Sequence, residues 1–295
     1  MYGTKANESE FDVTNMDYKT RRLNELYNMG TTPIYASRVD ARFPYALYVP
    51  HRLEKMDRAQ TRILVSVHGT GRMQSLYRDL FAEFAEYNNC IVLAPLFPAN
   101  VLQDGNMSGY KYLYEGDIRY DVVMLGMIDE VAERYQVQAD KVLMFGFSGG
   151  GHFTHRFTIL HPDRIYAASV GAPGAVTLID AAKPWWAGIK DCESLFGIRV
   201  EPQAFNNMPL HFVVGEADEE TWEITFGPDD KYYIDCANDA GRTRGERIRA
   251  LMDSFQKCGA RTRLDLVPDA THDVTAVAQK TREFFCDVLN GRFPD

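Results

Sequence analysis

The chain contains little cysteine, no long apolar run and no excess of positive charge. Its five cysteines are odd in number and widely spaced, and none forms a C-x-x-C pair. This pattern argues against a disulfide framework and against a zinc site, so we expect reduced cysteines, no metal and a cytoplasmic protein. The first residues are polar and acidic, so no secretory signal is visible, but a mature form after signal removal would look the same.

The apolar residues occur in strand-sized runs. The longest, such as residues 63–67, fall far short of the roughly 20 residues that a membrane-spanning helix needs, so we expect no membrane span. With 41 acidic and 32 basic residues, the formal net charge is −9, which repels nucleic-acid phosphates and anionic lipid. Nucleic acid is therefore not an expected partner. The 45% hydrophobic content is that of an ordinary globular protein.

Short β-branched and aromatic runs alternate with segments of helical period. This alternation is typical of a three-layer α/β fold, in which helices cover both faces of a mostly parallel sheet. The predicted strands are 46–50, 62–67, 90–94, 141–145, 165–170, 210–214 and 264–267, and the predicted helices are 117–135, 149–160, 245–258 and 274–289. We treat residues 1–295 as one domain, with residues 1–30 as an N-terminal arm.

Periodicity is lost between residues 171 and 208, where prolines and tryptophans gather. This stretch is too long for an ordinary connection, so we expect a cap or lid inserted between the predicted strands at 165–170 and 210–214. The adjacent Trp185 and Trp186 are candidate substrate-binding residues, because paired indoles could line an aromatic or acyl pocket. They could equally pack the cap onto the core.

Residues 146–150 read Gly-Phe-Ser-Gly-Gly and match the G-x-S-x-G pattern between a predicted strand and a predicted helix. Such a junction strains the serine, and it needs glycines where strand and helix pass too closely for side chains. Ser148 would then project its hydroxyl above the sheet as a nucleophile. An ordinary glycine-rich turn or a phosphate-binding loop is the alternative, but no lysine follows the motif.

A serine nucleophile needs a base and an orienting acid, and both follow in the required order along the chain. Asp218 and His272 each come shortly after a predicted strand. The carboxyl ends of strands meet at the ligand site of an open α/β sheet, so we expect Ser148, Asp218 and His272 to converge. The alternatives to Asp218 are its neighbours Glu216, Glu219 and Glu220.

The turn at residues 68–71, His-Gly-Thr-Gly, follows a predicted strand and is a suitable place for oxyanion donors. We expect Gly149 to provide one backbone amide and Thr70 the other, with Gly71 as the alternative to Thr70. His68 is expected to hold the loop through side-chain hydrogen bonds.

Three other polar groups are interpreted as structural. His152 and His155 lack the partners that a metal site needs, so we expect local packing or hydrogen bonds. Asp121 is expected to pair with Arg119 or Lys141. The dense basic stretch at 241–249 is interpreted as the solvated start of a helix.

The chain resembles the α/β-hydrolase superfamily, particularly its serine esterases, over roughly residues 40–290. The segments that carry the resemblance are the His-Gly-Thr-Gly turn, the Gly-Phe-Ser-Gly-Gly elbow, the His-Pro-Asp-Arg-Ile run at 161–165, the Gly-Glu-Ala-Asp loop at 215–218 and the Thr-His pair at 271–272. The feruloyl-esterase-like and polyhydroxyalkanoate-depolymerase-like branches look most similar. The resemblance implies an eight-stranded, mostly parallel sheet, a Ser-Asp-His triad and no cofactor.

The predicted function is a serine hydrolase that cleaves a small-molecule carboxylic ester through an acyl-enzyme intermediate. Amide, peptide or thioester hydrolysis by the same triad is one alternative, because the elbow does not encode the leaving group. A small-molecule-binding protein that has lost activity is another. The sequence leaves the oligomeric state open, a homo-oligomer included.

Overall fold

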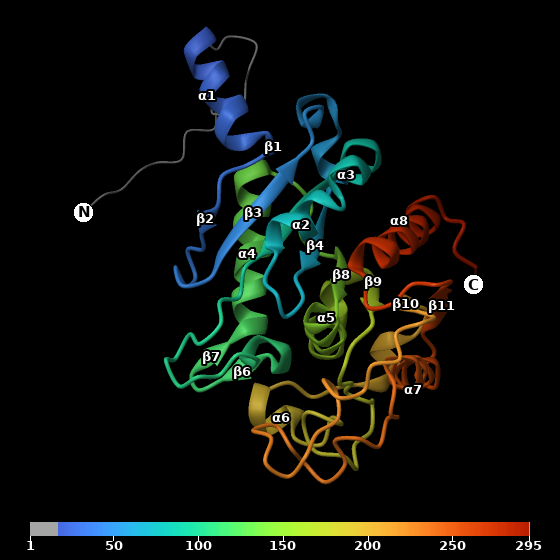
Figure 1. Ribbon diagram of the computed structural model, residues 1–295. Helices are drawn as coiled ribbons and strands as arrows, with labels where there is room; N and C mark the ends of the chain where they lie inside the picture. Colours follow the sequence, from blue (N-terminus) through green and yellow to red (C-terminus); the bar gives the residue numbers. More distant parts are fainter. Residues whose placement is uncertain (1–16, 295) are drawn as a thin grey trace.

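The computed structural model describes residues 17–294, so residues 1–16 of the expected N-terminal arm lie outside the described residues. The described part of the arm is helix α1 (Tyr18–Asn28), which buries none of its residues. Strand β1 (Gly30–Thr31) follows and pairs with the edge of the central sheet. Figure 1 shows α1 at one end of the molecule, away from the loops at the opposite end.

A mostly parallel sheet forms the centre of the described chain, as predicted. Eight strands cross it in the order β1, β3 (Pro44–Val49), β5 (Cys90–Pro95), β4 (Arg62–Val67), β8 (Val142–Phe147), β9 (Ile165–Gly171), β10 (Pro209–Gly215) and β11 (Arg261–Val267). Strand β2 (Tyr35–Ala36) adds a ninth by pairing with β3. Strand β3 pairs antiparallel with its neighbours β1, β2 and β5, and the pairs from β5 to β11 are parallel.

Helices flank the sheet. They are α2 (Gln74–Asp79), α3 (Ala82–Asn88), α4 (Tyr120–Tyr135), α5 (Gly149–Leu160), α7 (Arg244–Gln256) and α8 (Val274–Leu289). The rings of Phe84 and Phe285 join α3 to α8, and His161 after α5 contacts Asp121 of α4 at 2.9 Å. All six residues of β8 are buried, which is typical of a strand covered on both faces.

Helix α4 begins later than predicted, at Tyr120. The preceding residues form a small hairpin of β6 (Tyr114–Glu115) and β7 (Ile118–Arg119). Arg119 pairs with Asp121 at 2.7 Å, as predicted. The hairpin follows a short 3-10 helix, η4 (Gly109–Tyr112), which packs against α5. The predicted start of the helix at residue 117 is therefore wrong, because residues 118–119 belong to the hairpin.

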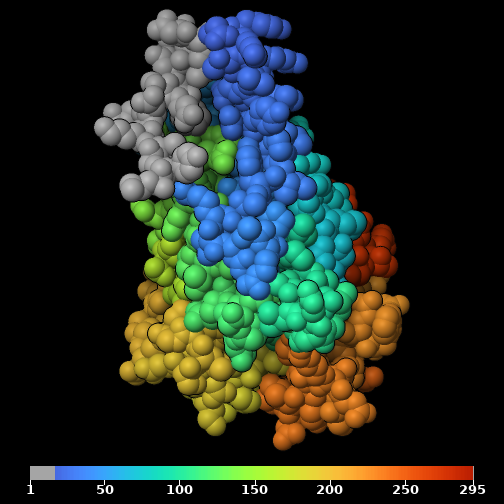
Figure 2. Space-filling model, turned by 90° about the vertical axis from the view of Figure 1, so that its left-hand side faces the viewer, coloured from blue at the N-terminus to red at the C-terminus, as the bar shows by residue number. Residues whose placement is uncertain are grey.

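The segment after β9 holds the short helix α6 (Cys192–Phe196) and lies beside the loop that follows β10. Figure 2 shows these two segments, in gold and orange, side by side at the end of the molecule opposite α1. They share a small second hydrophobic cluster that includes Tyr112, Trp186 and Ala237. This cluster packs the two loops together beyond the carboxyl ends of the strands.

Candidate active site

Ser148 lies at the junction of β8 and α5 in a strained backbone conformation, with φ 57° and ψ −118°. A methyl group on Gly146 would lie 2.2 Å from the carbonyl oxygen of Gly150, and one on Gly150 would lie 2.1 Å from that of Val67. The strand and the helix therefore pass too closely for side chains on either side of the serine. This is the local geometry of a nucleophile elbow.

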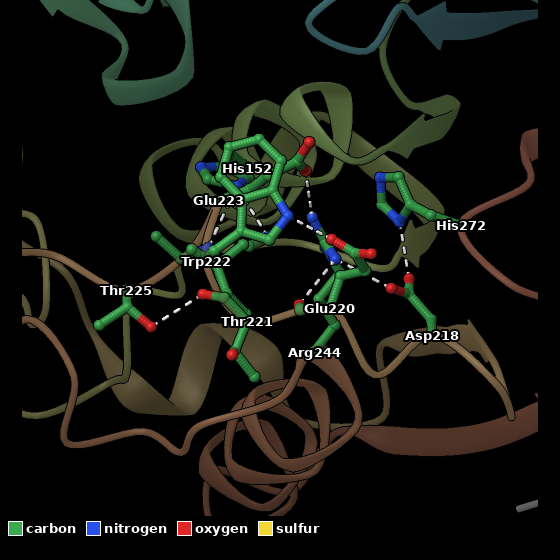
Figure 3. Close-up of polar contacts among 12 residues, drawn as sticks. His152, Asp218, Glu220, Thr221, Trp222, Glu223, Thr225, Arg244 and His272 are labelled. Carbon is green, nitrogen blue, oxygen red and sulfur yellow. Dashed lines mark hydrogen bonds and ion pairs between the residues drawn. The ribbon is translucent and has the colours of Figure 1, made fainter.

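His272 donates a hydrogen bond from Nδ1 to Oδ2 of Asp218 at 2.6 Å (Figure 3). The two side chains come from the loops that follow β11 and β10, which are neighbouring parallel strands. The amide of Ala217 bonds to the carbonyl of Ala270 at 2.9 Å and ties these loops together. Because Nδ1 carries the proton, Nε2 of His272 is left as a proton acceptor.

The neighbouring acids do not occupy the position of Asp218. Glu216, Glu219 and Glu220 are exposed, whereas the Asp218 side chain is 1% exposed. The Glu220 carboxylate accepts a hydrogen bond from the Trp222 indole instead. Within residues 17–294, Asp218 is the acidic residue of this loop that contacts His272.

Arg244 supports the Asp218 carboxylate from behind. Its Nη1 lies 2.9 Å from Oδ1 of Asp218, and its Nη2 lies 2.8 Å from Glu223 (Figure 3). The Arg244 and Asp218 side chains are only 3% and 1% exposed. The interpretation of residues 241–249 as a solvated helix start is therefore wrong for Arg244, and also for Arg247, which is 1% exposed and donates to backbone carbonyls.

The turn after β4 brings its backbone close to the start of α5. A methyl group on Gly149 would lie 3.1 Å from the amide nitrogen of Thr70. No group within residues 17–294 accepts a hydrogen bond from this amide. His68 holds the turn as predicted, because its Nδ1 contacts the Gly69 carbonyl at 2.8 Å and its Nε2 accepts from Phe97 at 3.0 Å.

A cavity of about 920 Å³ brings these groups together. Ser148, His272, Thr70 and Gly149 all line it. Most of the remaining wall comes from two loops, residues 104–112 and residues 223–232, and the segment 171–208 contributes Gly174. The loop before α4 and the loop after β10 thus contribute far more of the wall than the segment 171–208 does.

The two tryptophans are not in the cavity wall. Trp186 is 4% exposed, stacks edge-on against Tyr112 and donates to the carbonyl of Tyr232 at 2.8 Å. Trp185 packs against Phe196 of α6. A large aromatic side chain stabilises the fold most when it is fully buried. Trp186 is buried behind the residues that line the cavity and does not line it itself. Of the two open alternatives, the placement matches packing of the loops rather than substrate contact.

Lys111 on η4 is a wall residue that sequence reasoning missed. Burial, with smaller contributions from nearby arginines, lowers the pKa of its amine to about 8. Its Cε would lie 3.1 Å from a methyl group on Gly149, so the lysine reaches the start of α5. A lysine in a loop without a motif gives no signal in the sequence.

The histidines after Ser148 form local hydrogen bonds, as predicted. Nε2 of His152 accepts from the amides of Gly174 and Ala175 at 2.8 and 3.1 Å, and Nε2 of His155 accepts from Thr177 at 3.0 Å. Burial holds the pKa of both imidazoles well below its usual range. These neutral rings fix the segment after β9 onto α5.

No group of three or more His, Cys, Asp or Glu residues within 17–294 is arranged to hold a metal ion. None of the helices in this range combines the length and the apolar character needed to cross a bilayer.

Neither a family model nor a curated protein matches this sequence. Solved structures do match. A poly(aspartic acid) hydrolase from Sphingomonas sp. KT-1 is 23% identical, with 82% of this chain and 92% of that chain covered and a TM-score of 0.67. A poly(3-hydroxybutyrate) depolymerase from Bordetella parapertussis is 21% identical, with 86% and 85% covered and a TM-score of 0.66. An S-formylglutathione hydrolase from Agrobacterium tumefaciens is 13% identical, with 89% and 94% covered and a TM-score of 0.59. The chain has the α/β-hydrolase fold.

Proposed function

We propose that the protein is a serine hydrolase that cleaves a carboxylic ester, with Ser148, His272 and Asp218 as its catalytic triad. The observation that carries the proposal is the strained Ser148, which shares one cavity with a histidine whose Nδ1 is bonded to a buried carboxylate. That bond leaves Nε2 of His272 free to take the serine proton. Backbone strain at a serine between strand and helix supports a nucleophile, because strained residues cluster at functional sites and this turn presents the serine hydroxyl to the cavity.

In this mechanism the Ser148 oxygen attacks the ester carbonyl while Nε2 of His272 accepts its proton. The amides of Thr70 and Gly149 stabilise the oxyanion of the tetrahedral intermediate. The histidine then gives the proton to the leaving alkoxide, and an acyl-enzyme remains. Water, deprotonated by the same histidine, hydrolyses the acyl-enzyme and restores Ser148. Asp218 stabilises the charged imidazolium throughout.

Amide hydrolysis by the same triad is the second candidate. The poly(aspartic acid) hydrolase similar to this chain is named for a polymer whose units are joined by amide bonds. Rates on matched 4-nitrophenyl esters and 4-nitroanilides would separate the two activities. Because the 4-nitrophenyl ester is intrinsically much more reactive than the anilide, cleavage of the ester without detectable cleavage of the anilide supports the leading proposal, and efficient cleavage of the anilide supports the second.

Labelling with a fluorophosphonate tests the nucleophile directly. Intact mass and peptide mapping should find one adduct on Ser148 in the wild type, and labelling should slow strongly in His272→Ala. His51→Ala, which removes an exposed histidine, should label like the wild type. Ser148→Ala should lose turnover on the order of a million-fold. A folded wild type without an adduct, or equal labelling in His272→Ala, would refute the triad.

A further inference from the structure

Three nitrogen donors on residues that line the cavity have no hydrogen-bond acceptor within residues 17–294: Nζ of Lys111, Nδ1 of His152 and Nε of Arg244. The His152 and Arg244 atoms are sealed from solvent, so of these three donors Nζ of Lys111 is the one that a ligand in the cavity can reach. Nδ1 of His152 must carry the proton, because Nε2 accepts two backbone hydrogen bonds. A donor without an acceptor costs free energy, so the accessible ammonium of Lys111 indicates a ligand that places an acceptor at this position.

The acidic side chains of the same wall are already engaged. Asp104 pairs with Lys231 at 3.0 Å and Glu223 pairs with Arg244 at 2.8 Å. Two others accept from backbone amides: Asp230 from Gly227 at 2.5 Å and Asp273 from Thr275 at 2.8 Å. Among the described residues, Lys111 is therefore the basic side chain of the wall that forms no ion pair. The Glu223 carboxylate, which pairs with Arg244, acts on it at longer range and partly offsets the lowering of its pKa by burial.

Lys111 lies close to the proposed site of the reaction. A methyl group on Gly149 would lie 3.1 Å from Cε of Lys111 and 3.1 Å from the Thr70 amide nitrogen. The lysine thus lies next to the two amides proposed to hold the carbonyl oxygen. A substrate anion that reaches Lys111 must be attached close to the scissile carbonyl.

We propose that the cavity selects esters whose acyl group carries a carboxylate a few bonds from the scissile carbonyl, and that Lys111 binds this carboxylate. The inference rests on the proposed ester hydrolysis. A charge-assisted hydrogen bond from the ammonium would give Lys111 its missing partner. Lys111 is then a specificity residue, and the chemical steps belong to the triad.

The test compares two series of ethyl esters of increasing acyl length. One contains the monoethyl esters of dicarboxylic acids from malonate to adipate, and the other replaces the free carboxylate by an isopropyl group of similar shape. We expect the wild type to prefer the anionic series. Lys111→Met should lower kcat/KM for the preferred monoester about 10- to 100-fold, the range of one charged hydrogen bond, and should leave the neutral series within about threefold.

Two variants exclude a merely structural effect. Lys111→Arg keeps the charge and should retain most of the preference, whereas Lys183→Met removes a lysine that is paired with Asp239 outside the cavity and should change neither series. Since the pKa of Lys111 is about 8, the preference of the wild type should fall as the pH rises through 8. In Lys111→Arg the preference should stay constant over the same range.

An equal loss on both series in Lys111→Met would overturn the proposal, because it would make the lysine a general oxyanion donor. A wild type that prefers the neutral series would also overturn it. If the wild type neither labels with fluorophosphonate nor cleaves either series, the proposed hydrolysis fails. In that case, calorimetric titration with succinate, glutarate and adipate tests whether Lys111 binds a carboxylate independently of hydrolysis. Binding by the wild type that is lost in Lys111→Met supports the site, and no binding by the wild type refutes it.

Discussion

Removal of Arg244 should destabilise the fold strongly, although the residue sits in an arginine-rich helix start. Arg244 and Asp218 form an ion pair at 2.9 Å with side chains only 3% and 1% exposed. The variant Arg244→Met keeps the aliphatic volume but leaves the Asp218 carboxylate buried with His272 as its remaining side-chain partner. Breaking a buried ion pair by removing one partner costs about 3–5 kcal/mol.

This cost predicts a measurable shift in the unfolding midpoint. At about 2.1 cal/mol/K per residue, the unfolding entropy of a 295-residue chain is about 0.6 kcal/mol/K, so the midpoint should fall by about 5–8 °C. An exposed pair would contribute less than about 1 kcal/mol, or less than about 2 °C. Thermal unfolding followed by circular dichroism separates these two ranges.

Two further variants make the measurement decisive. Arg249→Met removes an exposed arginine from the same helix and should shift the midpoint by less than about 2 °C. The double variant Asp218→Asn/Arg244→Met should lose less stability than the sum of its single variants, with a coupling of at least about 1 kcal/mol. A shift below about 2 °C in Arg244→Met, or additive single variants, would refute the buried ion pair.

Two other stability predictions follow from the geometry. Gly150→Ala should lower the free energy of unfolding by about 1–3 kcal/mol, and with it the urea midpoint, because its methyl group would lie 2.1 Å from the Val67 carbonyl oxygen. In Gly71→Ala the methyl group meets nothing within 4 Å, so equal midpoints for these two variants would contradict the reasoning. Burial raises the pKa of Asp265, but hydrogen bonds from His211 and a neighbouring arginine outweigh it and hold the pKa at about 2. This carboxylate stabilises the fold above pH 4 and loses the effect as the pH falls through 2, so Asp265→Asn should cost about 1–2 kcal/mol at pH 7 and only a few tenths of a kcal/mol near pH 2. A loss that stayed constant between these pH values would show that the charge is not involved.

Local patterns were sufficient for the central sheet and for the elbow. The strand at residues 62–67 was predicted with its observed bounds because its interior is mostly apolar and buried. Helix α8 also has its predicted bounds, since Asp273 caps its first turn by accepting from the Thr275 amide. The G-x-S-x-G spacing predicted the close approach of strand and helix because no other residue type fits there. In each case the residues that determine the local structure lie within a few positions of it in the sequence.

Features that depend on distant segments were not predictable in the same way. A capping box formed by Thr243 and Glu246 starts α7 at Arg244, one residue before the predicted start. Which arginine of that turn is buried is decided by the loop after β10, where Asp218 and Glu223 lie. The basic run indicated a solvated surface because charge patterns report the average exposure of a residue type. An arginine paired with a carboxylate from another loop departs from that average.

The tryptophan pair and Lys111 illustrate the same limit at the cavity. Aromatic residues in a loop indicate burial, but Trp186 gains its burial behind the wall, against Tyr112, and not from a ligand. The net charge of −9 suggests that anions are repelled, yet the charge of a whole protein is screened within roughly 10 Å in salt solution. Selectivity inside a cavity depends on the few groups that face it and on whether each already has a partner. Lys111 has none within the described chain, so an acidic protein can carry a site that favours an anionic substrate.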